Sequence, residues 1–139
     1  MSRMASKKPI NVGVVGLGRI GWGFHLKQLK KNKAFKITAC VDPMAERRRE
    51  AEEVYGCKTF ANINDFLKSG VAELAVICTF SVDHCRHTVA ALRSGHHVLV
   101  EKPMANSVRE VDRMIAAAKK AKRILTVHQS SRKTAPPRF

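Results

Sequence analysis

The sequence predicts an α/β fold, a doubly wound parallel sheet with helices on both faces. Three observations indicate this fold. Six short apolar segments alternate with helical segments along a chain of 139 residues that contains no internal repeat. A glycine-rich turn follows the first apolar segment, and an acidic residue follows the second. The alternation predicts one domain over residues 10–128 with the strand order 3-2-1-4-5-6, the Rossmann arrangement.

The stretch NVGVVGLGRIGWG, residues 11–23, carries the motif that organises this fold. A valine-rich run, typical of a strand buried on both faces, leads directly into the glycines Gly16, Gly18 and Gly21, spaced G-x-G-x-x-G. Glycines cluster in turns for many reasons, so the spacing alone is a weak signal. In a dinucleotide-binding fold the first glycine allows the tight turn, the second lets the backbone approach the pyrophosphate, and the third lets the helix pack closely. The free N–H groups at the start of the helix then bind the diphosphate.

The other elements follow from apolar runs and helix-end signals. We expect strands at 10–15, 35–41, 58–60, 73–79, 97–100 and 124–127. We expect helices at 19–31, 44–55, 62–70, 83–94 and 108–122. Gly56 is placed to end the second helix and Asn62 to cap the third. Ser107 and Glu110 have the spacing of a capping box at the last helix.

The first helix has one unusual residue in its interior. Gly23 costs about 1 kcal/mol relative to alanine at a helical position, which indicates either a close contact there or a tolerated glycine. We expect Ile20 and Phe24 to face the sheet, together with Leu26 and Leu29.

Composition indicates a globular protein without a membrane segment. Apolar residues make up 45% of the chain, which argues against disorder. No apolar run reaches membrane-spanning length, and the N-terminus lacks the apolar core of a signal peptide. The four cysteines have no metal-binding spacing, so we expect no metal site and a reducing, cytoplasmic location. We interpret residues 1–9 as a flexible arm and 129–139 as a linker, and we assign structural roles to His25, His87, His96 and His97.

The charge is strongly positive, with 26 Lys and Arg against 11 Asp and Glu. Such an excess is found in nucleic-acid-binding proteins. Here the basic residues are spread over several helices, and the single Trp and single Tyr cannot be interleaved with them for base stacking. The favoured explanation is therefore that the basic residues lie on solvent-exposed faces of helices. No specific nucleic-acid partner is expected. A further reading is that a larger protein carries the balancing acids elsewhere.

A cofactor site is expected where the carboxyl ends of the strands meet, at the switch point of the sheet. Asp42, at the end of the second strand, is placed to bind the adenosine ribose, although Asp42-Pro43 also has the composition of a plain turn. A carboxylate there repels a 2′-phosphate, so NAD is favoured over NADP. Arg47 and Arg48 lie close enough to Asp42 in the sequence to bind a 2′-phosphate, so NADP stays an alternative.

Two further segments reach the same edge of the sheet. Thr79, Phe80 and Ser81 follow the fourth strand, where they would face the cofactor or simply form a polar strand end, and His84 is either a cofactor contact or a structural histidine. Lys102 ends the fifth strand, where Pro103 restricts it to extended geometry. A lysine held there would donate a hydrogen bond to a substrate oxygen during hydride transfer, and the alternative is a surface salt bridge. Glu101 would orient its ammonium or satisfy nearby backbone.

The chain resembles the N-terminal domain of the glucose–fructose oxidoreductase / inositol dehydrogenase (Gfo/Idh/MocA) family. The resemblance rests on VGVVGLGRIG at 12–21, CVDPMAERR at 40–48, AELAVICTFSVDH at 72–84 and SGHHVLVEKPMANSVREVDRMI at 94–115. It implies an NAD(P)-dependent oxidoreductase of sugars, cyclitols or related hydroxy compounds, with Lys102 as catalytic residue and Gln129 near the site. The expected cofactor contacts are Gly16, Leu17, Gly18, Arg19, Ile20, Asp42, Thr79, Phe80, Ser81, His84, Glu101 and Lys102.

The sequence departs from the family pattern in two ways. Phe80 stands where the family usually has proline. The chain also stops where the family's second domain would begin, which by the resemblance holds the substrate, supplies further catalytic groups and often forms the oligomer interface. We therefore expect a fragment that binds cofactor with little or no turnover. The alternative is a non-catalytic module that senses a nucleotide or mediates an interaction.

Overall fold

The computed structural model describes residues 8–128. The predicted linker at 129–139, Gln129 included, and the first seven residues of the predicted arm lie outside this range.

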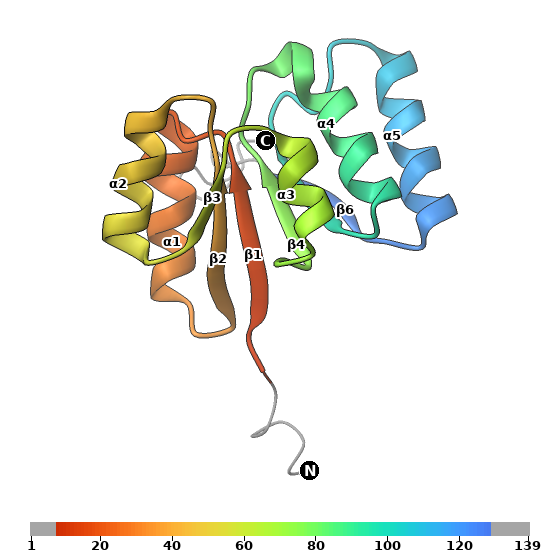
Figure 1. The fold of residues 1–139 in the computed structure, drawn as a ribbon. Helices are drawn as coiled ribbons and strands as arrows, with labels where there is room; N and C mark the ends of the chain where they lie inside the picture. The colour runs from red at the N-terminus through yellow and green to blue at the C-terminus, as the bar shows by residue number, and fades with distance from the viewer. Residues whose placement is uncertain (1–7, 129–139) are drawn as a thin grey trace, which may run out of the picture.

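Six parallel strands form one sheet in the order β3-β2-β1-β4-β5-β6 (Figure 1). Their bounds are β1 Ile10–Val15, β2 Phe35–Val41, β3 Lys58–Phe60, β4 Leu74–Ile77, β5 His97–Glu101 and β6 Leu125–His128. The predicted fold class and strand order are confirmed. Strands β1, β2 and β3 follow one another toward one edge of the sheet, and β4, β5 and β6 follow one another toward the other edge. The switch point lies between β1 and β4, and sheets of this kind bind ligands in the crevice at the carboxyl ends of these two strands.

Helices cover both faces of this sheet, with bounds η2 Gly21–His25, α1 Leu26–Lys31, α2 Ala45–Tyr55, α3 Ile63–Ser69, α4 Ser81–Arg93 and α5 Val108–Ala121. Helices α1 and α2 cover one face of the sheet, and α3, α4 and α5 cover the other (Figure 1). All bounds agree with the predicted ones to within two residues.

Two apolar cores result from the alternation of side chains along the strands. Val12 and Val14 of β1 belong to the core under α1 and α2, where Leu26 and Ala51 complete it. Val15 belongs to the core under α3, α4 and α5. Successive strand residues point to opposite faces, so a run that is apolar on both faces is buried between two helical layers.

Most of the predicted helix-end signals are confirmed. Gly56 ends α2 in the left-handed region with φ 63°, and the Asn62 side chain accepts a hydrogen bond from the Asp65 N–H at 2.9 Å. The Ser107 hydroxyl accepts from the Glu110 N–H at 3.2 Å, as in a capping box. The reciprocal bond differs, because the Glu110 carboxylate accepts from the N–H of Asn106, one residue before the cap.

The first helix departs from the prediction. It contains a π-turn in which the Leu26 N–H donates to the carbonyl of Gly21, five residues earlier. The extra residue in this turn shifts which side chains face the sheet. Ile20 is 42% exposed, so its predicted inward position is wrong, whereas Leu26 is buried as predicted. His25, for which no inward position was predicted, is buried as well. Gly23 meets no atom within 4 Å of where a Cβ would lie, so it is a tolerated glycine.

Candidate cofactor site

The glycine loop joins β1 to the π-turn at the carboxyl edge of the sheet. Gly16 has φ 99°, and a Cβ there would lie 2.8 Å from the carbonyl oxygen of Cys78, so only glycine fits. A Cβ on Gly21 would lie 1.9 Å from the carbonyl oxygen of Gly16. At Gly18, by contrast, a Cβ would meet no atom within 4 Å. The space next to the Cα of Gly18 is therefore open.

Asp42 holds the glycine loop against the end of β2. Its side chain is 4% exposed, and its Oδ2 accepts a hydrogen bond from the Leu17 N–H at 3.0 Å. Its Oδ1 accepts from the Met44 N–H at 2.9 Å, which is the contact of an Asx turn. The carboxylate therefore belongs both to a turn and to the loop. An ionised carboxylate has about four acceptor sites, so these contacts leave capacity for a hydroxyl.

The two arginines beyond Asp42 have different partners. Arg47 lies 3.3 Å from the Asp42 carboxylate, with 44% of its side chain exposed. Arg48 donates from Nη1 to the carbonyl oxygens of Asp42 and Pro43, each at 2.9 Å. Arg48 therefore stabilises the turn, and Arg47 partly neutralises the carboxylate.

The predicted residues after β4 divide into exposed and buried ones. Phe80 is 82% exposed, beside the start of α4. His84 is buried, and its two ring nitrogens lie 2.8 Å from the carbonyl oxygen of Thr79 and 2.7 Å from that of Pro103. The Thr79 hydroxyl lies 2.9 Å from Nδ1 of His87. These contacts favour the structural alternative for His84, which joins the chain after β4 to the chain after β5.

Lys102 lies at the same edge and is exposed. It precedes a cis peptide bond to Pro103. Within residues 8–128 its ammonium forms no ion pair, so the salt bridge considered as an alternative is not present there. Glu101 does not pair with it either.

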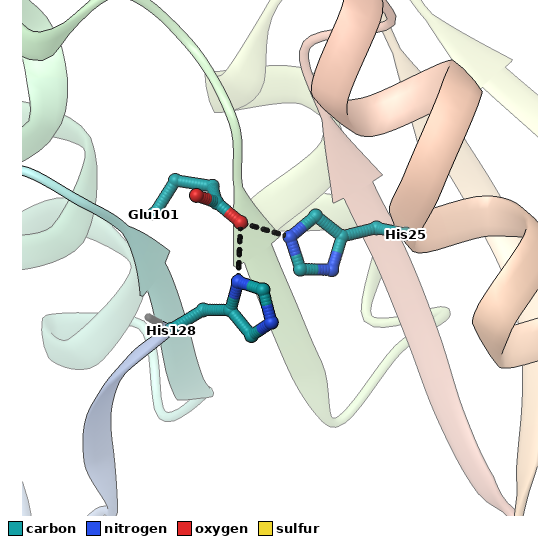
Figure 2. Close-up of side chains that lie close together, drawn as sticks. All are labelled: His25, Glu101 and His128. Carbon is teal, nitrogen blue, oxygen red and sulfur yellow. Dashed lines mark hydrogen bonds and ion pairs between the residues drawn. The ribbon is translucent and has the colours of Figure 1, made fainter. Parts of the chain in front are cut away.

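Glu101 instead binds two histidines (Figure 2). Its Oε2 contacts Nε2 of His25, from the π-turn, and lies 2.8 Å from Nδ1 of His128, at the end of β6. The sequence analysis missed this cluster, because no local pattern relates residues 76 positions apart. The only signal was the structural role assigned to His25, and that assignment did not identify its partner.

The protonation state of His25 follows from its burial. Burial lowers the pKa of His25, and the hydrogen bond to Glu101 raises it by less. The imidazole is thus neutral near pH 7, with one N–H. A carboxylate only accepts hydrogen bonds, so the nitrogens that face it carry the protons.

The three residues also have the composition of a metal site. Their ligand atoms lie within 4.8 Å of one another, and two histidines with one glutamate form a ligand set found around zinc. A metal would need the lone pairs of the nitrogens that face Glu101, whereas the hydrogen bonds need protons on the same nitrogens. A bound metal and these hydrogen bonds therefore exclude each other.

One hollow in the described part of the chain lies away from the candidate site. It has a volume of about 500 Å³ and lies between α4 and α5, with Arg93, Arg113 and Lys120 among its lining residues. Its other lining residues are small and apolar, and none comes from the glycine loop or the strand ends.

A glycine loop at the switch point of a parallel sheet, with a carboxylate at the end of the second strand, defines a dinucleotide-binding Rossmann domain. The model of the oxidoreductase family with an NAD-binding Rossmann fold matches residues 10–129. The chain therefore belongs to the Gfo/Idh/MocA family, as the resemblance implied. Among residues 8–128, no helix combines the length and apolar character needed to cross a membrane.

Named relatives are longer than this chain. A myo-inositol 2-dehydrogenase of Thermotoga maritima is 32% identical over 117 residues, which cover 84% of this chain and 35% of the relative. The structure of the WlbA dehydrogenase from Bordetella pertussis, in complex with NADH and UDP-GlcNAcA, matches with a TM-score of 0.86 and 29% identity, over 91% of this chain and 37% of that one. A 3-ketoreductase from Actinomadura kijaniata, in complex with NADP and TDP-benzene, matches with a TM-score of 0.82 and 26% identity, over 91% of this chain and 41% of that one. The chain thus spans between 35% and 41% of the length of these relatives.

Proposed function

We propose that this chain is the cofactor-binding part of an NAD(P)-dependent dehydrogenase that acts on a hydroxyl group of a sugar, cyclitol or related compound. The observation that carries the proposal is the glycine loop, with open space next to the Cα of Gly18 and a buried carboxylate behind the loop. Family membership supports the reaction class. The activities of the relatives, among them a myo-inositol 2-dehydrogenase, support the substrate class.

Each site residue has a distinct task in this proposal. The N–H groups at the start of the π-turn hold the diphosphate, and Asp42 accepts a hydrogen bond from the adenosine ribose. Bound nicotinamide supplies the hydride acceptor or donor. Lys102 donates a hydrogen bond to the substrate oxygen and stabilises the charge that develops on it. By the family resemblance, substrate contacts and a proton-transferring base come from a second domain, so we expect little turnover from these 139 residues alone.

The proposal includes a preference for NAD over NADP. The Asp42 carboxylate would repel a 2′-phosphate, and the nearer arginine is already paired with it. The matched solved structures include complexes with NADH and with NADP. Dissociation constants of this chain for NADH and for NADPH test the preference. Tighter binding of NADPH than of NADH would contradict this preference.

The proposed location is a reducing compartment, the cytoplasm. All four cysteines are free thiols, which fits that compartment.

Two glycines provide a matched test of cofactor binding. At both Gly18 and Gly23, no atom lies within 4 Å of where a Cβ would be, and neither residue has a positive φ, so a small side chain fits at both. Only Gly18 lies where the diphosphate would approach. We expect Gly18→Val to abolish NADH binding, measured by calorimetry or by energy transfer from Trp22, the single tryptophan, and Gly23→Val to bind as the unaltered chain does. No heat or fluorescence change with the unaltered chain at millimolar NADH would refute the proposed function.

A further inference from the structure

The cluster of His25, Glu101 and His128 joins three parts of the fold. Side-chain exposure is 6% for His25, 9% for Glu101 and 13% for His128, so all three interact largely away from water. The histidines come from the π-turn and from β6, and the carboxylate comes from the end of β5 (Figure 2). Charge-assisted hydrogen bonds in such surroundings are strong and hold their partners in one geometry.

The hydrogen bonds of Glu101 also restrain the neighbouring residue Lys102, which belongs to the candidate site. Glu101 directly precedes Lys102 and Pro103. The Pro103 carbonyl oxygen lies 2.7 Å from Nδ1 of buried His84. The three-residue segment is therefore held on both sides of Lys102, and the lysine between these anchors is exposed.

His25, which is one of the two partners of Glu101, lies close to the glycine loop in the sequence. His25 is the last residue of the π-turn, and that turn begins at Gly21, the third glycine of the motif. The π-turn moves His25 into the buried position from which it reaches Glu101. One hydrogen bond therefore connects the helix that follows the glycine loop to the segment that carries Lys102.

We propose that Glu101, held by His25 and His128, is a positioning residue that sets Lys102 and the nicotinamide half of the cofactor site relative to the glycine loop. This inference rests on the proposed function. Glu101 and His128 lie at the ends of β5 and β6, whereas Asp42, which would contact the adenosine ribose, lies across the switch point after β2. Loss of the cluster should therefore weaken contacts to nicotinamide and leave contacts to the adenosine half unchanged.

The two histidines offer matched variants because they use different nitrogens. His25 donates from Nε2, whose place the amide nitrogen of glutamine can take, whereas the shorter asparagine cannot reach it. His128 donates from Nδ1, whose place the amide nitrogen of asparagine can take, whereas glutamine extends past it. His25→Gln and His128→Asn thus keep each hydrogen bond, and His25→Asn and His128→Gln remove it. Glutamine and asparagine are thus tested at both positions, and each of them keeps the hydrogen bond at one position and removes it at the other.

The test measures dissociation constants of the 139-residue chain for NADH and for ADP-ribose, which lacks nicotinamide. We expect His25→Asn and His128→Gln to bind NADH about tenfold more weakly and ADP-ribose within about twofold of the unaltered chain, as a lost charge-assisted hydrogen bond predicts. We expect His25→Gln and His128→Asn to bind both ligands normally. A purely structural role would weaken both ligands equally, and that result would overturn the inference.

Two other outcomes are equally decisive. If NADH binding is unchanged in all four variants, the inference fails while the proposed function stands, whereas absence of binding of either ligand to the unaltered chain overturns both. Titration with Zn²⁺ alone tests the metal alternative. Stoichiometric Zn²⁺ binding that His25→Gln and His128→Asn abolish would overturn the inference, because those variants keep the hydrogen bonds and lose the metal ligands.

Discussion

Gly21→Ala tests the close packing at the start of the π-turn. The new Cβ would lie 1.9 Å from the carbonyl oxygen of Gly16, and ordinary contact begins at 3.4 Å, so the two groups must separate by about 1.5 Å. The obstructing atom is backbone, which cannot swing away as a flexible side chain can. Overpacking of this kind costs about 3 kcal/mol at the upper end of its usual range. Because alanine is about 1 kcal/mol better than glycine in a helix, we expect a net loss of about 2 kcal/mol.

Thermal unfolding followed by circular dichroism measures this loss. For a chain of this size, 1 kcal/mol corresponds to roughly 3–4 °C, so Gly21→Ala should lower the midpoint by about 7 °C. Gly23→Ala is the control, since no atom lies within 4 Å of its Cβ position, and it should raise the midpoint by about 3 °C. A Gly21→Ala chain as stable as the Gly23→Ala chain would refute the packing argument.

Two further predictions concern buried polar groups. Burial lowers the pKa values of His25, His87 and His96 below their usual value of 6.5 in the folded chain, so the unfolded chain binds protons more readily on the acid side. Their contribution to stability is present above about pH 6.5 and is lost as the pH falls below it, so the urea midpoint should be lower at pH 5.5 than at pH 7.5, and a higher midpoint at pH 5.5 would contradict this. Asp42→Asn leaves one oxygen for the Leu17 N–H and the other donors, so we expect a loss of about 1.5–3 kcal/mol in urea unfolding and a smaller preference for NADH over NADPH. If stability and cofactor preference are both unchanged, the Asp42 carboxylate neither stabilises the loop nor selects between the two cofactors.

Local patterns in the sequence were sufficient for the sheet and for the glycine loop. The alternation of Val12, Val14 and Val15 between the two cores is a property of strand geometry, and it can be read without knowing which helix covers which face. The spacing of the glycines likewise reflects backbone constraints within a few residues. Gly16 needs a positive φ, and Gly21 has no room for a Cβ. Helix caps at Asn62 and Ser107 are local for the same reason.

The details of the site depended on contacts between residues distant in the chain. Ile20 was predicted to face the sheet from a regular helical period, but the π-turn changes that period within one turn. Asp42 was expected to bind ribose, and its hydrogen bond to the Leu17 N–H, 25 residues away, appears only in the folded chain. The exposed ammonium of Lys102, free of the neighbouring carboxylate, is also a consequence of where other side chains lie.

The amino-acid order alone was enough to establish a parallel, doubly wound sheet with a nucleotide loop, because strand period, glycine conformation and helix caps act over a few neighbouring residues. Only the tertiary structure places Glu101 against the imidazoles of His25 and His128, and His84 against the carbonyl oxygen of Pro103. Those partners are separated by 19 to 76 positions. Their meeting depends on how helices and strands pack, and sequence periodicity carries no information about such pairings.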